Sequence, residues 1–137
     1  MRSLLLPFGV ALLLASSATL TFANEASTAA ALISAYRTSQ GLGPVVVDPR
    51  LNVLADYQAR SVASAGQLSH GNFSGRMYQA GIYGSAAENL SMGPQSVTAA
   101  IARWKSSPAH NENLLMRSAA KIGLARSGRV WALVLSQ

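Results

Sequence analysis

A run of six apolar residues near the C-terminus, 130–135, constrains the fold more than any other feature of the chain. Successive side chains of a β-strand point to opposite faces, so this run predicts a strand that is covered on both sides. Ile122 and Leu124 alternate with less apolar residues and predict a second strand, and Ser127-Gly128 is typical of a tight turn between the two. The C-terminal part therefore predicts a hairpin inside a sheet with a further layer on each face.

Three segments before this run have the apolar spacing of helices. Residues 28–40 predict the first helix. The second begins after Asp48, whose side chain suits a helix N-cap, with Pro49 in its first turn, and the third begins near Ser96. Helices that precede a doubly covered strand predict an α+β fold, built as a three-layer α-β-α sandwich.

The first 23 residues predict a secretory signal peptide. Arg2 supplies a positive charge, residues 4–14 form an apolar segment, and the small residue Ala23 suits cleavage. The alternative is an uncleaved anchor, because residues 3–23 carry no charge and are almost long enough to cross a bilayer. The polar residues between positions 16 and 21 favour cleavage. We therefore expect residues 24–137 to form one secreted or periplasmic domain without a stable membrane span.

The charge of the chain is strongly basic, with a net charge of +6 and a pI near 10.6. The arginines are spread from Arg37 to Arg129, and no basic run is interleaved with aromatic residues. We therefore expect no nucleic-acid partner. Scattered charge usually lies on a solvated surface, so solubility or contact with an anionic envelope surface accounts for the balance.

The chain contains no cysteine. This excludes disulfides, thiolate metal sites and a cysteine nucleophile. A secreted domain without disulfides must be stabilised by its core alone.

The two histidines of the chain, His70 and His110, are the first candidates for a functional site, together with Glu88 between them. Ser107-Pro108 predicts the start of a short helix, which would place His110 in its first turn. The positive end of a helix disfavours a charged imidazole, and the neutral form is the one that binds metal or accepts a proton. The spacing of the three residues does not show that they meet, and each also suits a purely structural role.

Eight short segments of the chain occur in the order that is typical of one protein family. They are Tyr36-Arg37, Gly41-Leu42-Gly43-Pro44, Asp48-Pro49-Arg50-Leu51, Leu68-Ser69-His70, Ala80-Gly81-Ile82-Tyr83, Ala87-Glu88-Asn89-Leu90, residues 104–110 and Val130-Trp131-Ala132-Leu133-Val134. In this order the chain, from about Ala30 onward, resembles the CAP superfamily of cysteine-rich secretory, antigen-type and pathogenesis-related proteins. Many eukaryotic members are rich in disulfides. Because it has no cysteine, this chain resembles the bacterial, SCP-like branch of the family instead.

The resemblance implies a CAP-type three-layer sandwich and a central cavity lined by His70, Glu88 and His110. In such domains the two histidines can bind zinc or another divalent cation, and the acidic residue lies with them. Members often have a second acidic residue where this chain has Ser107. Its loss weakens a hydrolytic mechanism more than it weakens metal binding by two histidines.

Two functions of different classes follow from these residues. The first is a non-catalytic binding module whose cavity takes a small ligand, a lipid or an envelope component. The alternative is a metal-dependent, peptidase-like hydrolase, in which Glu88 would activate water on a metal held by His70 and His110. A purely structural or protein-interaction role is a third reading.

Trp104 and Trp131 occupy apolar periodic positions, so we expect them in the core. We expect Glu112 to point into solvent.

Overall fold

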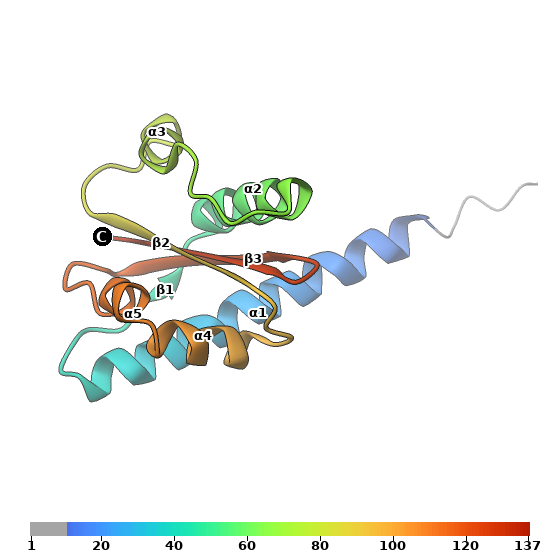
Figure 1. Ribbon diagram of the computed structural model, residues 1–137. Helices are drawn as coiled ribbons and strands as arrows, with labels where there is room; N and C mark the ends of the chain where they lie inside the picture. Colours follow the sequence, from blue (N-terminus) through green and yellow to red (C-terminus); the bar gives the residue numbers. More distant parts are fainter. Residues whose placement is uncertain (1–10) are drawn as a thin grey trace, which may run out of the picture.

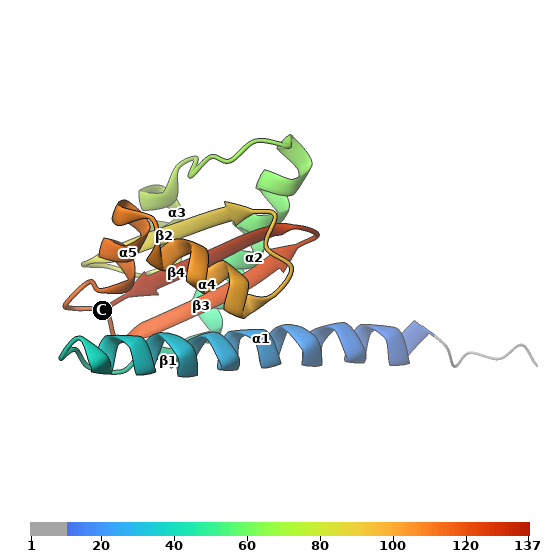
Figure 2. The same cartoon turned by 60° about the horizontal axis from the view of Figure 1, so that its bottom comes forward.

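The computed structural model describes residues 11–137, with side chains from Leu20 onward. Figure 1 shows three layers: α2 and α3 lie on one side of a central sheet, and α1, α4 and α5 lie on the other. Figure 2, turned by 60°, shows that α1 runs past the end of the sheet towards the N-terminus. The α+β, three-layer fold predicted from the sequence is confirmed.

The sheet has four strands, β1 (Val46–Val47), β2 (Ala86–Met92), β3 (Lys121–Ser127) and β4 (Val130–Ser136). Their order is β1-β3-β4-β2, so β4 is central and β2 is an edge strand. The hairpin of β3 and β4 turns at Gly128, which has a φ of 58°. Only β1 pairs in parallel, with β3.

Strand β4 is buried along its whole length, as the apolar run predicts. Trp131, Leu133 and Leu135 belong to the core shared with α1, α4 and α5. Val130, Ala132 and Val134 belong to the core beneath α2 and α3. The two sets alternate along the strand, so β4 contributes side chains to the cores on both faces of the sheet.

The sequence correctly predicted where the first helix ends and where the second helix begins. Helix α1 (Ala11–Ser39) ends where expected, but it begins before the predicted cleavage position, so the junction after Ala23 lies within it. Residues 1–10 of the predicted signal lie outside the described residues. Helix α2 (Pro49–Ala65) begins at the Asp48 cap and packs closely on β3, because a Cβ at Gly123 would overlap the backbone of α2.

The remaining helices include one that the sequence pattern did not indicate. Helix α4 (Val97–Lys105) has Ser96 as its N-cap, and α5 (Pro108–Leu114) begins at the predicted proline. The additional helix is α3 (Phe73–Gln79), capped by Asn72. Between residues 11 and 137, no helix is both long and apolar enough to be a candidate membrane span.

Arg37 corrects the view that the basic residues lie on the solvated surface. Its side chain is fully buried and donates to four backbone carbonyl groups, over distances of 2.8–3.1 Å. These carbonyls belong to Gly43, Leu114, Met116 and Ala119. Burial lowers the pKa of Arg37 from its ordinary value, because the interior disfavours the charged form. Arg37 therefore connects the end of α1 to the loops around α5.

Candidate functional site

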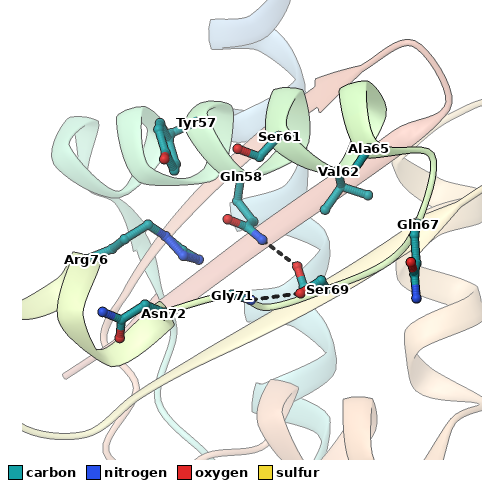
Figure 3. A pocket seen from close by; sticks show the side chains of 10 residues that line it. All are labelled: Tyr57, Gln58, Ser61, Val62, Ala65, Gln67, Ser69, Gly71, Asn72 and Arg76. Carbon is teal, nitrogen blue, oxygen red and sulfur yellow. Dashed lines mark hydrogen bonds between the residues drawn. The ribbon is translucent and has the colours of Figure 1, made fainter.

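The segment after α2 carries His70 and is fixed by side chains of the α2–α3 layer. The amide nitrogen of Gln58 donates to the carbonyl of Ser69, and the Ser69 hydroxyl accepts from the backbone of Gly71 (Figure 3). Arg76, on α3, donates to the carbonyl of His70. These bonds hold the backbone of an exposed segment in one position, from which the His70 side chain reaches Glu88.

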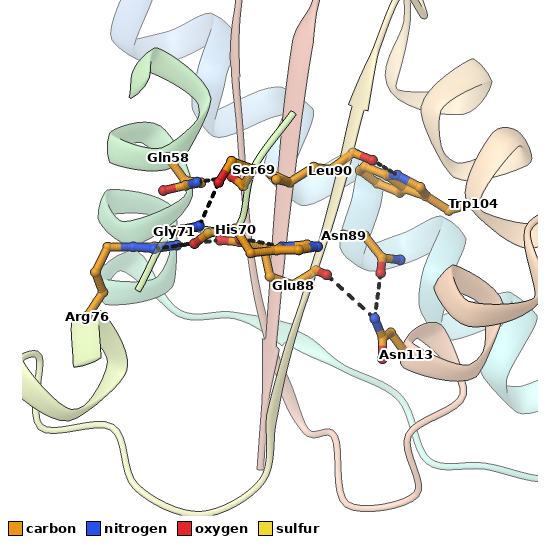
Figure 4. A network of polar contacts seen from close by, with 10 residues as sticks. All are labelled: Gln58, Ser69, His70, Gly71, Arg76, Glu88, Asn89, Leu90, Trp104 and Asn113. Carbon is orange, nitrogen blue, oxygen red and sulfur yellow. Dashed lines mark hydrogen bonds and ion pairs between the residues drawn. The ribbon is translucent and has the colours of Figure 1, made fainter. Parts of the chain in front are cut away.

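Glu88 is the centre of the site, because its buried carboxylate contacts two other side chains. It lies on β2, with only 1 % of its side chain exposed. Nδ1 of His70 lies 2.9 Å from Glu88 Oε1, and an Arg76 amino group lies 3.0 Å from Glu88 Oε2 (Figure 4). A carboxylate only accepts hydrogen bonds, so Nδ1 of His70 is the nitrogen that donates to Glu88. Nε2 is the ring nitrogen that does not take part in this contact.

His110 reaches the edge of the sheet from α5, on the opposite face of β2. Asn89 follows Glu88 in the strand and therefore points to the other side, where its amide donates to the carbonyl of His110 over 3.0 Å. Asn113 donates to the side chain of Asn89 over 2.9 Å and fixes its orientation (Figure 4). Nδ1 of His110 is buried and has no hydrogen-bond partner among the described residues.

The structure brings the three predicted site residues to the same edge strand, but it does not place them in one contact group. Glu88 binds His70 directly, whereas His110 is connected to β2 through Asn89. Sequence reasoning missed Arg76, which carries the charge opposite Glu88. No pattern marked it, because an isolated arginine in a helix that the sequence did not indicate looks like an ordinary surface residue.

The pKa of His110 is lowered from its ordinary value. Burial, which penalises the charged imidazolium, is the main cause, and the nearby charge of His70 is the second. The sequence predicted the same preference for the neutral form, but attributed it to the helix end.

In metal-free protein, this shift should make the free energy of unfolding depend on pH. Unfolded His110 takes up a proton near pH 6.5, whereas folded His110 resists protonation, so its contribution is complete above about pH 6.5 and is lost as the pH falls towards the lowered folded value. Urea unfolding between about pH 7.5 and 5 should therefore show a smaller loss of stability in His110→Asn than in the wild type. The same pH slope in both proteins would contradict the burial of His110 as a neutral group.

Few side chains at this edge of the sheet could serve as metal ligands. Within residues 11–137, no group of three or more His, Cys, Asp or Glu side chains could hold an ion. Each histidine has one feature of a metal ligand. Nδ1 of His70 is oriented by a carboxylate, as in metal-binding histidines, and Nδ1 of His110 has no partner among the described residues. Water or a ligand would have to supply the remaining coordination positions.

Other residues near the site take the roles that the sequence predicted for them. Trp104 is fully buried and donates from its indole nitrogen to the carbonyl of Leu90. Glu112 is exposed, on the solvent side of α5. Asn113 donates to the side chain of Asn89 over 2.9 Å and, over 3.5 Å, to the carbonyl of Glu88.

Comparison with known proteins gives a family match and several similar structures. The model of the family described as "CAP: Cysteine-rich secretory protein family" matches residues 30–129. No curated protein matches the chain. An extracellular protein containing an SCP domain from Bacillus anthracis superposes with a TM-score of 0.78 at 18% identity, over 83% of this chain and 40% of that one.

Two further structures extend the similarity. A cysteine-rich secretory protein from Staphylococcus aureus has a TM-score of 0.74 at 18% identity, covering 82% of this chain and 38% of its own. An outer surface protein from Borrelia burgdorferi has a TM-score of 0.68 at 20% identity, covering 78% and 87%. The chain thus spans about two fifths of the first two proteins. At these identities the comparison establishes a shared fold.

Proposed function

Because the chain belongs to the CAP (cysteine-rich secretory protein) family, we propose that it is a secreted binding module. Its recognition site is the edge of β2, to which His70 is joined through Glu88 and His110 through Asn89. In this proposal the two histidines together take a divalent cation such as zinc. The ligand is a small molecule, a lipid or an envelope component. The Glu88–His70 contact supports this proposal, together with a half-buried His110 whose pKa is lowered and whose Nδ1 has no partner among the described residues.

The arrangement of Glu88 favours binding over catalysis. A general base needs a free carboxylate oxygen within reach of the water that it activates. Both oxygens of Glu88 are engaged, one by His70 and one by Arg76, and the side chain is almost completely buried. We therefore assign Glu88 the role of orienting His70. A bound divalent cation would supply positive charge and open coordination positions for a ligand.

Secretion is the second part of the proposal. Helix α1 contributes its first core residue at Ala26, and the side chains of residues 20–23 are exposed. Removing residues 1–23 would therefore take no described core residue from the domain. We expect protein from its native cell to begin at Asn24, as N-terminal sequencing would show. A chain that retains Met1 and is found in the membrane fraction would indicate an anchored protein instead.

Zinc should raise the melting temperature of the protein, because a ligand that binds only the folded state stabilises it by mass action. His70→Ala and His110→Ala should each abolish most of the shift, and it should fade as the pH falls, since protonated imidazoles do not bind metal. A thermal-unfolding series with increasing zinc measures the effect. With only two protein nitrogens, the affinity should be modest.

The matched control is Glu112→Gln, which removes an exposed carboxylate from the same helix as His110 and should leave the zinc shift intact. Equal shifts in the wild type and in the double histidine variant would contradict the metal site. Incubation with peptide, ester and glycan panels tests the binding role separately. Turnover that disappears in His70→Ala would identify an enzyme.

A further inference from the structure

A second concave site lies between α2 and the segment that carries His70, and neither histidine lines it. It is a cavity of about 310 Å³ between α2 and the loop that leads into α3 (Figure 3). Ligand pockets in proteins have volumes of about 300–1,000 Å³, so this one suits a small ligand of one or two rings. Its lining belongs to segments that are firmly positioned, because Gln58 binds Ser69 and Arg76 binds the carbonyl of His70.

The lining has the chemistry of a site for an uncharged, hydroxyl-rich molecule. Half of the ten lining residues carry amide or hydroxyl groups, namely Gln58, Ser61, Gln67, Ser69 and Asn72, and the others add apolar surface between them, as from Val62 and Ala65. These groups can both donate and accept hydrogen bonds, as the hydroxyl groups of a sugar require. Tyr57 adds an aromatic ring at the rim, with 56% of the residue exposed, which gives an apolar surface for the C–H face of a sugar ring.

The charge of the cavity also favours a neutral ligand. No aspartate or glutamate lines it, and Arg76 is its one cationic residue. The Arg76 guanidinium is already compensated, because it is paired with the buried carboxylate of Glu88 over 3.0 Å. It also lies over the rings of Tyr57 and Phe73, with its central carbon 6.0 and 5.7 Å from their centres. An anion would therefore find little uncompensated positive charge here.

Several of these polar groups are positioned before any ligand binds. The Gln58 amide and the Ser69 hydroxyl are fixed by their bonds within the segment, and Asn72 accepts from the backbone of Gly75 over 3.0 Å. Groups that are already ordered lose little conformational entropy on binding. We propose that this cavity is a second binding site, which takes a neutral mono- or disaccharide unit stacked on the face of the Tyr57 ring that Arg76 does not cover.

The site is tested by titrating the protein, in the form isolated from its native cell, with two neutral sugars, maltose and N,N′-diacetylchitobiose. Glucuronic acid is the charged comparison. We expect amide chemical-shift changes in NMR spectra at sugar concentrations up to about 10 mM, confined to the cavity segments. Tyr57→Ala should weaken binding about tenfold, through loss of the ring contact. Ser61→Leu, at an exposed position of α2, should fill the cavity and block binding without removing a core residue.

The matched control is Tyr78→Ala, which removes an exposed tyrosine of α3 that does not line this cavity and should leave binding unchanged. No shift with either neutral sugar, or tighter binding of glucuronic acid than of both, would overturn the proposal. So would equal binding by the wild type and Ser61→Leu. The zinc experiments do not bear on this outcome, because neither histidine lines the cavity.

Discussion

Replacement of Trp131 by alanine should lower the free energy of unfolding by about 3–5 kcal/mol, the usual cost of removing a large core aromatic. The indole is fully buried in the central strand and packs in the core shared with α1 and α4. Its ring nitrogen also donates to the carbonyl of Pro94 over 2.9 Å, so the variant leaves both a cavity and a lost hydrogen bond. Urea unfolding measures the difference directly.

Two further variants separate these contributions. Trp131→Phe keeps most of the ring but cannot bond to Pro94, so its loss should be clearly smaller than that of the alanine variant. Tyr78→Ala removes an aromatic side chain that is 70% exposed and should change the stability by about 0.5 kcal/mol or less. A Trp131→Ala protein that melts within about two degrees of the wild type would contradict the doubly covered position of β4.

Replacement of Arg37 by methionine should have a comparable effect, of about 3–5 kcal/mol, because a buried polar group that loses its partner remains desolvated. Four backbone carbonyls would lose their donor together. Through those carbonyls Arg37 connects the end of α1 with the last residue of α5 and the loop that follows it, so the packing of that region should also loosen. Thermal unfolding should show a fall of more than about 10 °C.

Arg37→Lys and Arg60→Met are the controls for this prediction. Lysine keeps the charge, but its single ammonium group cannot donate to all four carbonyls. Arg37→Lys should therefore lower the free energy of unfolding by an intermediate amount. Arg60 is an exposed arginine paired with Asp56 four residues earlier, and its replacement should cost about 0.5 kcal/mol or less. Similar melting temperatures for Arg37→Met and Arg60→Met would show that the four bonds to Arg37 do not stabilise the fold.

Much of the fold could be predicted from the sequence because its signals are local. The capping side chain of Asp48 and the proline after it specify the start of α2 without any distant contact. The apolar run of β4 specifies its own environment, since no solvent-facing strand would bury both sets of side chains. The same holds for Ser96 and the start of α4.

Features that depend on distant partners were not predicted. The residues of β2 include Ala, Glu and Asn, which have low β-propensity, and they form a strand because β4 offers a paired partner along all seven positions. Arg37 looks like a surface residue until α5 and its loops close over it. The resemblance indicated His70, Glu88 and His110, but only the three-dimensional arrangement shows that Arg76 neutralises Glu88 and that Asn89 positions His110.

Diffraction data from crystals grown with zinc at neutral pH, collected on both sides of the zinc absorption edge, test the central claim most directly. The proposal predicts an anomalous peak bonded to ring nitrogens of both His70 and His110, with Glu88 still bound to Nδ1 of His70. The peak should be absent when both histidines are replaced by alanine. A protein that shows no zinc at this edge of β2, or the same peak in the double variant, would contradict the account.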